Sequence, residues 1–169
     1  MDAIKTCRIS RRDWDNVCQA TQTITARKLD LISAAGMTVS DIRAKIMEAG
    51  YKVVIVDYLQ IVSSKGSSRY EQVTNISIEL HTMAQSLGVT VLALAQLSRS
   101  EGDRQPKNSD LRESGQIEQD ADMVMFIYRD DYYNKDTAEM GVAEIIIAKQ
   151  RNGPIGTVKL AWLPDYTKF

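Results

Sequence analysis

The stretch VVIVDYLQ, residues 53–60, decides the fold. Its four consecutive apolar, β-branched residues predict a strand that is buried on both faces, as in a parallel sheet covered by helices. Asp57 directly follows this strand, at the end where ligands of open α/β sheets bind. A carboxylate in that place can hold the magnesium ion of a nucleotide, directly or through water. The segment alone leaves open whether Asp57 binds a metal or merely ends the strand.

Helices and strands alternate around this stretch. Helix starts are indicated by Ser10 with Asp13 and by Thr38 with Asp41, and Gly50 and Gly88 mark helix ends. A long helix carries the apolar stripe of residues 73–87, and residues 98–112 and 129–140 are expected to be loop and exposed linker. Strands are expected at 29–33, 53–56, 89–95, 123–128, 143–149 and 157–163, with a hairpin turn at Asn152-Gly153. This order predicts an α/β fold with a largely parallel sheet, helices on both of its faces and a C-terminal antiparallel hairpin.

The length, composition and net charge of the chain argue against several classes of protein. The chain has 169 residues, 44% of them hydrophobic, and a formal net charge of −1, so charge alone does not indicate a nucleic-acid binder. Cys7 and Cys18 lie eleven positions apart and His81 is the single histidine, which argues against a zinc site. Two unpaired thiols suit a reducing cytosol. The apolar run near residues 53–62 is too short and too polar to span a bilayer.

Two further places could carry chemistry. Gln96 follows the expected strand at 89–95, where a neutral amide could contact a γ-phosphate or orient a water. Lys149 and Arg151 are two positions apart and would point to one side of a strand, so that together they could hold a phosphate as it transfers. From spacing alone, a loop-starting glutamine and a pair of solvated strand-end charges are the competing interpretations.

The polar segment 97–113 contains four basic and four acidic residues, which favours a solvated loop. DNA could still be held by backbone N–H groups near Ser114 and Gly115, because glycine permits close approach.

Four runs together resemble consecutive motifs of the DnaB-type replicative DNA helicases. They are VVIVDYLQ, VLALAQLSRS, NSDLRESGQIEQDADMVMFIYRD and AEIIIAKQRNGPIGTVKL. The resemblance covers nearly the whole chain and rests on the order and approximate spacing of the motifs as well as their content. It implies a RecA-like fold of the P-loop NTPase type and a hexameric ring that uses ATP and Mg²⁺, encircles single-stranded DNA and unwinds duplex. Primase and a helicase loader are the implied partners, and no membrane is involved.

The resemblance also implies roles for individual residues. Asp57 matches the Walker B acid and Gln96 the glutamine that senses phosphate. Lys149 and Arg151 match the cations that reach the neighbouring subunit's nucleotide. The implied DNA-binding residues of the central channel are Arg112, Glu113, Ser114 and Gly115.

The chain departs from the family pattern in one respect. A phosphate-binding loop needs GxxxxGK followed by Ser or Thr, and none of the nine glycines here precedes lysine. We therefore expect residues 1–169 to be a single partial RecA-like domain without the Walker A loop, the P-loop strand and the N-terminal collar domain, and inactive alone. A non-catalytic DNA- or helicase-binding module and a RecA-class strand-exchange protein are the alternatives.

Overall fold

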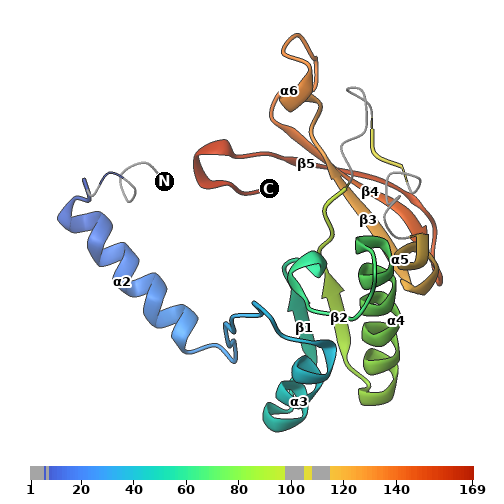
Figure 1. The fold of residues 1–169 in the computed structure, drawn as a ribbon. Helices are drawn as coiled ribbons and strands as arrows, with labels where there is room; N and C mark the ends of the chain where they lie inside the picture. Colours follow the sequence, from blue (N-terminus) through green and yellow to red (C-terminus); the bar gives the residue numbers. More distant parts are fainter. Residues whose placement is uncertain (1–5, 7, 98–104, 108–114) are drawn as a thin grey trace. The chain divides into compact units, whose positions relative to one another are not determined.

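The computed structural model describes residues 6, 8–97, 105–107 and 115–169 (Figure 1). It divides into two compact units. The first comprises residues 1–33 and 163–168, and the second comprises residues 34–162 and 169. Within the described ranges, no helix is both long and apolar enough to cross a membrane.

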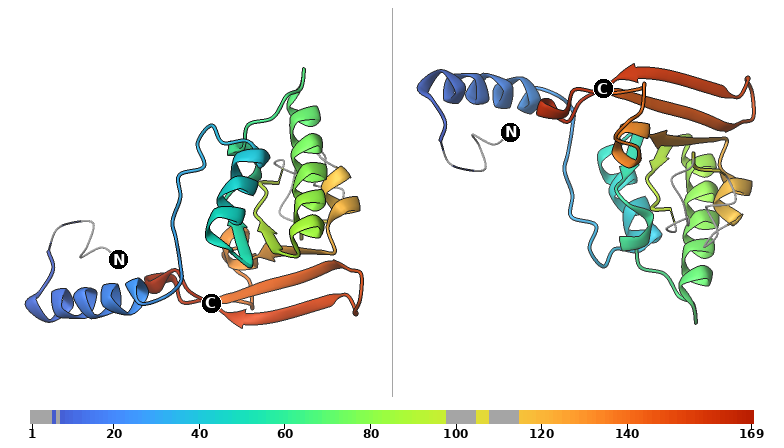
Figure 2. Two further views of the ribbon diagram at one scale, coloured as in Figure 1. Left: turned by 90° about the horizontal axis from the view of Figure 1, so that it is seen from below. Right: turned by 90° about the horizontal axis from the view of Figure 1, so that it is seen from above.

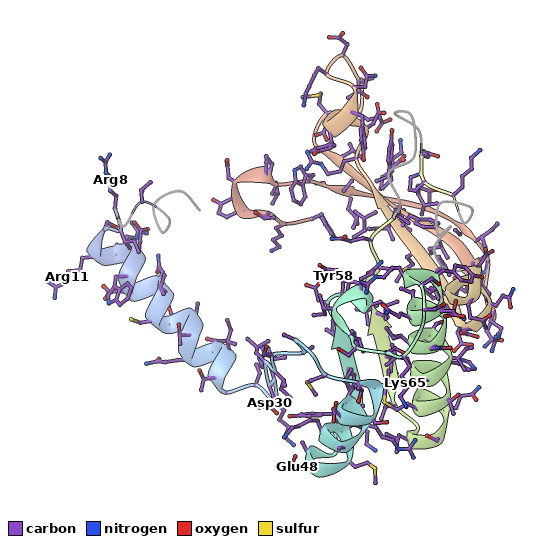
Figure 3. All side chains as sticks on the ribbon, viewed as in Figure 1. Arg8, Arg11, Asp30, Glu48, Tyr58 and Lys65 are labelled. Atoms are coloured by element: carbon purple, nitrogen blue, oxygen red, sulfur yellow. The ribbon has the colours of Figure 1, made fainter. Side chains whose placement is uncertain are left out.

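The first unit contains helix α2 (Arg11–Thr25) and the short helix η3 (Pro164–Tyr166). The expected helix start is confirmed, because Ser10 and Asp13 form a capping box in which the Asp13 amide donates to Ser10 Oγ at 3.2 Å. None of the α2 residues is buried, and the labelled side chain of Arg11 projects away from the helix in Figure 3. The strand expected at 29–33 is wrong. These residues have no ladder partner among those that the structure describes, and a strand requires one.

The core of the second unit lies between two helices and a parallel pair of strands. The Thr38–Asp41 capping box and the left-handed Gly50 and Gly88 begin and end the helices as expected. The largest fully buried side chains are Leu59, Ile76, Met83 and Val73. The elements are α3 (Val39–Ala49), β1 (Val53–Val56), η1 (Leu59–Ile61), α4 (Arg69–Leu87) and β2 (Thr90–Ala93).

Strands β1 and β2 pair in parallel, with Val53 opposite Thr90 and Val56 opposite Ala93. Only one face of this pair packs against the core that α3 and α4 share, through residues such as Val54 and Val56. On the other face Val53 and Ile55 are 62% and 61% exposed. The expectation that this strand is buried on both faces is therefore wrong within the described residues. The core helices supply apolar partners for alternate residues only, which leaves a bare face made by Val53, Ile55, Leu92 and Leu94.

The remaining strands form a separate antiparallel sheet in the order β3-β4-β5. The three strands expected in this part of the chain are confirmed, as are the antiparallel ending and the turn at residues 151–155. Figure 2 shows β4 and β5 as a long two-stranded ribbon. Strand β3 buries alternate residues, whereas Met123, Met125 and Ile127 are exposed. The bounds are β3 (Met123–Tyr128), β4 (Val142–Gln150) and β5 (Gly156–Ala161).

The segment 129–140, expected to be an exposed polar linker, contains helix α6 (Asp130–Tyr133) and a buried acid. Arg129 donates from Nε to Asp131 Oδ1 at 3.0 Å, and the Gly141 amide donates to Asp131 Oδ2 at 3.1 Å. The Arg129 guanidinium also lies 4.5 Å from the centroid of the Trp162 ring. These contacts explain why a carboxylate is buried here, because a buried charge requires an opposite charge and hydrogen-bond donors.

Candidate functional site

The site begins where β1 and β2 end. Parallel strands end at the same edge of their sheet, so Asp57, the residue after β1, and Gln96, three residues after β2, lie at one edge. The ladder continues into this region, because the Leu94 amide donates to Val56 O at 3.0 Å and the Leu59 amide to Leu94 O at 2.8 Å. Tyr58, labelled in Figure 3, marks the place. The structure therefore brings together two of the residues that the sequence singled out.

Gln60 ties the two strand ends to each other. Its Nε2 donates to Gln96 O at 3.3 Å, and the Gln96 amide lies 3.5 Å from Gln60 Oε1. The guanidinium of Arg69, at the start of α4, donates to the Gln60 carbonyl. Sequence reasoning missed Gln60, although its position three residues after Asp57 placed it beside the strand end.

The free groups at this edge fit a magnesium nucleotide. The Asp57 side chain is exposed and makes no hydrogen bond or ion pair with any other described residue, and the Gln96 side chain is exposed as well. Mg²⁺ in nucleotide sites commonly takes one or two carboxylates together with phosphate oxygens and water. One free carboxylate beside one free amide could therefore hold the ion and contact a phosphate. In the parts of the chain that the structure describes, no cluster of three metal-ligating side chains occurs.

Lys149 and Arg151 lie together at a second place, the connection between helix α5 (Gly115–Asp120) and β3. Lys149 Nζ donates to the carbonyls of Glu118 and Gln119, the second at 3.1 Å. Arg151 Nη1 lies 2.7 Å from Asp122 Oδ1, and its amide donates to Asp122 O at 2.9 Å. None of these contacts involves the edge where Asp57 and Gln96 lie.

Three details at this second place differ from the sequence-based expectations. Strand β4 ends at Gln150, so Arg151 lies in the turn and not on the strand that was expected to carry both cations. Helix α5 was not predicted, because only Ile117 among its six residues is a large apolar side chain. Asp122, the partner of Arg151, was also missed, and its place one residue before β3 is the signal that could have found it.

Of the four expected DNA-binding residues, Arg112, Glu113 and Ser114 lie outside the described residues, as does most of the expected loop at 98–112. Gly115 is the first residue of α5 and is exposed. A Cβ atom added at Gly115 would meet no atom of the described residues within 4 Å, so these residues do not require glycine there.

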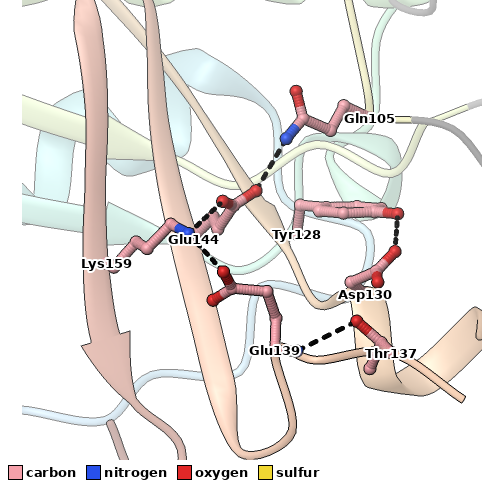
Figure 4. A network of polar contacts seen from close by, with 7 residues as sticks. All are labelled: Gln105, Tyr128, Asp130, Thr137, Glu139, Glu144 and Lys159. Atoms are coloured by element: carbon pink, nitrogen blue, oxygen red, sulfur yellow. Dashed lines mark hydrogen bonds and ion pairs between the residues drawn. The ribbon is translucent and has the colours of Figure 1, made fainter. Parts of the chain in front are cut away.

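A cavity of about 300 Å³ lies against the antiparallel sheet and is lined mainly by acidic and polar side chains. Figure 4 shows the polar contacts of this region. Tyr128 donates to Asp130 at 2.9 Å, and Lys159 contacts Glu139 at 2.8 Å and Glu144 at 3.8 Å. Burial, together with the hydrogen bond to Asp130, raises the pKa of Tyr128 to about 12. The hydrogen bond to Glu139 raises the pKa of Lys159. Because these groups satisfy one another, the network is structural.

Comparison with known proteins gives concordant matches. The family model described as DnaB-like helicase C terminal domain matches residues 1–169. The replicative DNA helicase DnaB of Geobacillus stearothermophilus is 45% identical over 98% of this chain and 39% of its own length. The replicative DNA helicase DnaC of Bacillus subtilis (strain 168) is 44% identical with the same coverage. The chain thus spans about two fifths of the length of these curated relatives.

A solved structure agrees with these matches in three dimensions. It is that of a DnaB-like replicative helicase, described together with its interactions with primase. The two chains superpose with a TM-score of 0.88 at 40% identity, over 96% of this chain and 43% of that one. The two proteins are therefore similar in sequence as well as in fold.

Proposed function

The chain belongs to the family of DnaB-like helicase C-terminal domains, and on this basis we propose that it forms part of the motor of an ATP-dependent replicative DNA helicase. The observation that carries the proposal is the meeting of Asp57 and Gln96 at one edge of the parallel strands, where the RecA-like fold holds a nucleotide. The residues of this edge and of the α5–β3 connection have complementary chemistry. The first can hold a metal and contact a phosphate, and the second supplies positive charge.

In the proposed mechanism Asp57 would hold Mg²⁺, whose positive charge would offset the negative charge of the nucleotide's phosphates. The Gln96 amide contacts the γ-phosphate, and its backbone is kept in place by Gln60. Arg151 acts on nucleotide bound by the adjacent subunit. It can leave Asp122 at little cost, because the side chains of both residues are at least half exposed and such ion pairs contribute little stability.

The remaining parts of the proposal concern the assembled protein. Six such domains form a ring around single-stranded DNA, which residues 112–115 contact through the backbone, and primase and a helicase loader are its protein partners. We place this activity in the cytoplasm. The 169 residues alone do not hydrolyse ATP, because they contain no GxxxxGK loop to position the phosphates. DNA-stimulated turnover by the purified chain that Asp57→Ala abolishes would contradict this statement.

The experiment uses a chimera, in which this chain replaces the matching part of the Geobacillus relative. Arg151→Ala in the chimera should lower ATP turnover on the order of a thousandfold while leaving nucleotide affinity nearly unchanged, the size of effect known for arginine fingers. Lys45→Ala is the matched control, because Lys45 pairs with Glu48 on the exposed surface of α3.

Mixing two inactive chimeras tests action between subunits. One carries Arg151→Ala and the other an inactivated phosphate loop. If Arg151 acts on a neighbour's nucleotide, some mixed interfaces contain both intact parts and turnover partly returns. Rings that demonstrably contain both variants yet stay inactive would refute the role in trans and favour the interpretation of Lys149 and Arg151 as two solvated charges.

A further inference from the structure

Gln60 has a fixed place beside the end of the parallel strands. It lies in η1, whose backbone is anchored because Leu59 and Val62 are buried in the core that α3 and α4 share. The Gln60 carbonyl accepts a hydrogen bond from the guanidinium of Arg69, at the start of α4. Arg69 is itself held by Gln72, because it donates to Gln72 Oε1 at 3.4 Å. Gln60 is thus held both by the core and by the first turn of α4.

The side chain of Gln60 continues the hydrogen bonding of the strands. The backbone ladder ends with the Leu94 amide on Val56 O at 3.0 Å and the Leu59 amide on Leu94 O at 2.8 Å. Beyond this point Gln60 Nε2 donates to Gln96 O at 3.3 Å, and the Gln96 amide lies 3.5 Å from Gln60 Oε1. A carboxamide offers a donor and an acceptor, as a peptide group does. The side chain of Gln60 therefore replaces the backbone that turns away from the ladder at η1.

The direction of the Gln96 side chain depends on this pair of contacts. The side chain is exposed, and no hydrogen bond holds it to another residue within the described ranges. Its backbone, by contrast, is bound on both its amide and its carbonyl by Gln60. The place of the Gln96 amide at the strand edge is therefore determined through the backbone, by a residue 36 positions away in the sequence.

We propose that Gln60 is a positioning residue for hydrolysis, which fixes where the Gln96 amide meets the γ-phosphate. The role of Gln96 rests on the proposed function, whereas the Gln60–Gln96 pair does not. Phosphoryl transfer depends mainly on positioning and charge stabilisation, and a displacement of about 1 Å can cost on the order of a hundredfold in rate. Gln60 contacts the backbone of Gln96 and not the nucleotide. Its loss should therefore lower turnover and leave the affinity for ATP nearly unchanged.

Amide hydrogen exchange measured by NMR on the 169-residue chain tests the pair itself. Gln60→Met keeps the length of the side chain and removes both its donor and its acceptor. It should speed exchange of the Gln96 amide roughly two- to tenfold, the factor that corresponds to one net hydrogen bond. The Leu94 amide is the internal reference, because its bond to Val56 O does not involve Gln60. Unchanged exchange at Gln96, or equally faster exchange at both amides, would overturn the pair.

ATP turnover by the chimera with the Geobacillus relative tests the role in hydrolysis. Gln60→Met should lower kcat on the order of ten- to a hundredfold, with KM for ATP changed less than about twofold. The same change should have no further effect in a Gln96→Ala background, because Gln60 acts through Gln96. Asn75→Leu is the matched control and should leave kcat unchanged. It removes another bond from a side-chain amide to the backbone, in which Asn75 Nδ2 donates to Lys65 O at 3.0 Å.

The possible results separate the inference from the proposed function. An unchanged kcat in Gln60→Met, or an equal loss in the Gln96→Ala background, would overturn the role of Gln60. A raised KM with unchanged kcat would place Gln60 in nucleotide binding and would overturn it as well. A parent chimera without turnover would refute the proposed function, and with it the role in hydrolysis, whereas the exchange result for the pair would stand.

Discussion

Replacing Asp131 by alanine should destabilise the second unit more than any exposed ion-pair variant. The carboxylate is 8% exposed, and it accepts hydrogen bonds from Arg129 and from the Gly141 amide. Removing one partner of a buried ion pair costs about 3–5 kcal/mol, because the other charge stays buried without compensation. Arg129 keeps 28% of its side chain exposed and can partly rehydrate. We therefore expect a loss near the lower end, about 3 kcal/mol in the free energy of unfolding.

Equilibrium urea unfolding followed by the fluorescence of Trp162 measures this loss. The ring of Trp162 lies against Arg129, and Trp14→Phe removes the other tryptophan of the chain. Asp131→Asn keeps an acceptor and should lose about half as much. Glu48→Ala breaks an ion pair exposed on both sides and should lose less than about 0.5 kcal/mol. If Asp131→Ala loses no more than Glu48→Ala, the burial and pairing of Asp131 do not stabilise this segment.

Three further results are expected. The neutral phenol of Tyr128 should stabilise the fold fully below about pH 10, which is the ordinary pKa of tyrosine. This contribution should be lost as the pH rises through about 12, the raised pKa of Tyr128 in the folded chain. An ultraviolet titration should therefore show a late step of phenolate formation that Tyr128→Phe removes. Ile76→Ala should cost about 2–5 kcal/mol in urea unfolding, because Ile76, on α4, is fully buried in the core, and a loss under 1 kcal/mol would contradict that packing. Copies of the chain should associate through the bare face of β1 and β2, because exposed apolar patches of this kind mark interaction surfaces. Sedimentation should show Ile55→Lys shifting the mass towards monomer, and a strictly monomeric parent chain at high concentration would refute the association.

The local structure could be predicted wherever the residues that determine an element lie close together in the sequence. The capping boxes at Ser10 and Thr38 are examples, since both partners of each lie within four residues. The end of β1 was predictable because an apolar run followed by Asp57 marks the edge of a parallel sheet, whereas β2 ends at Ala93, two residues before the expected end. The helix caps and the hairpin followed from glycine and turn residues in the same way.

Features that depend on distant partners could not be predicted. The run VVIV predicts burial on both faces, but burial depends on what other segments pack against it, and on one face of β1 the described residues supply no helix. Helix α5 is stabilised by Ser77 and Lys149, which are far from it in sequence and which no periodicity reveals. The same holds for Gln60, whose bonds to Gln96 span 36 positions.

The most direct test of the central claim is strand separation by the chimera with the Geobacillus relative, measured as ATP-dependent release of a labelled strand from a forked DNA duplex. We expect the chimera to unwind the fork, Asp57→Ala and Arg151→Ala each to abolish unwinding, and Lys45→Ala to leave it intact. A chimera that assembles and binds ATP and single-stranded DNA but releases no strand would contradict the assignment of this chain to a helicase motor.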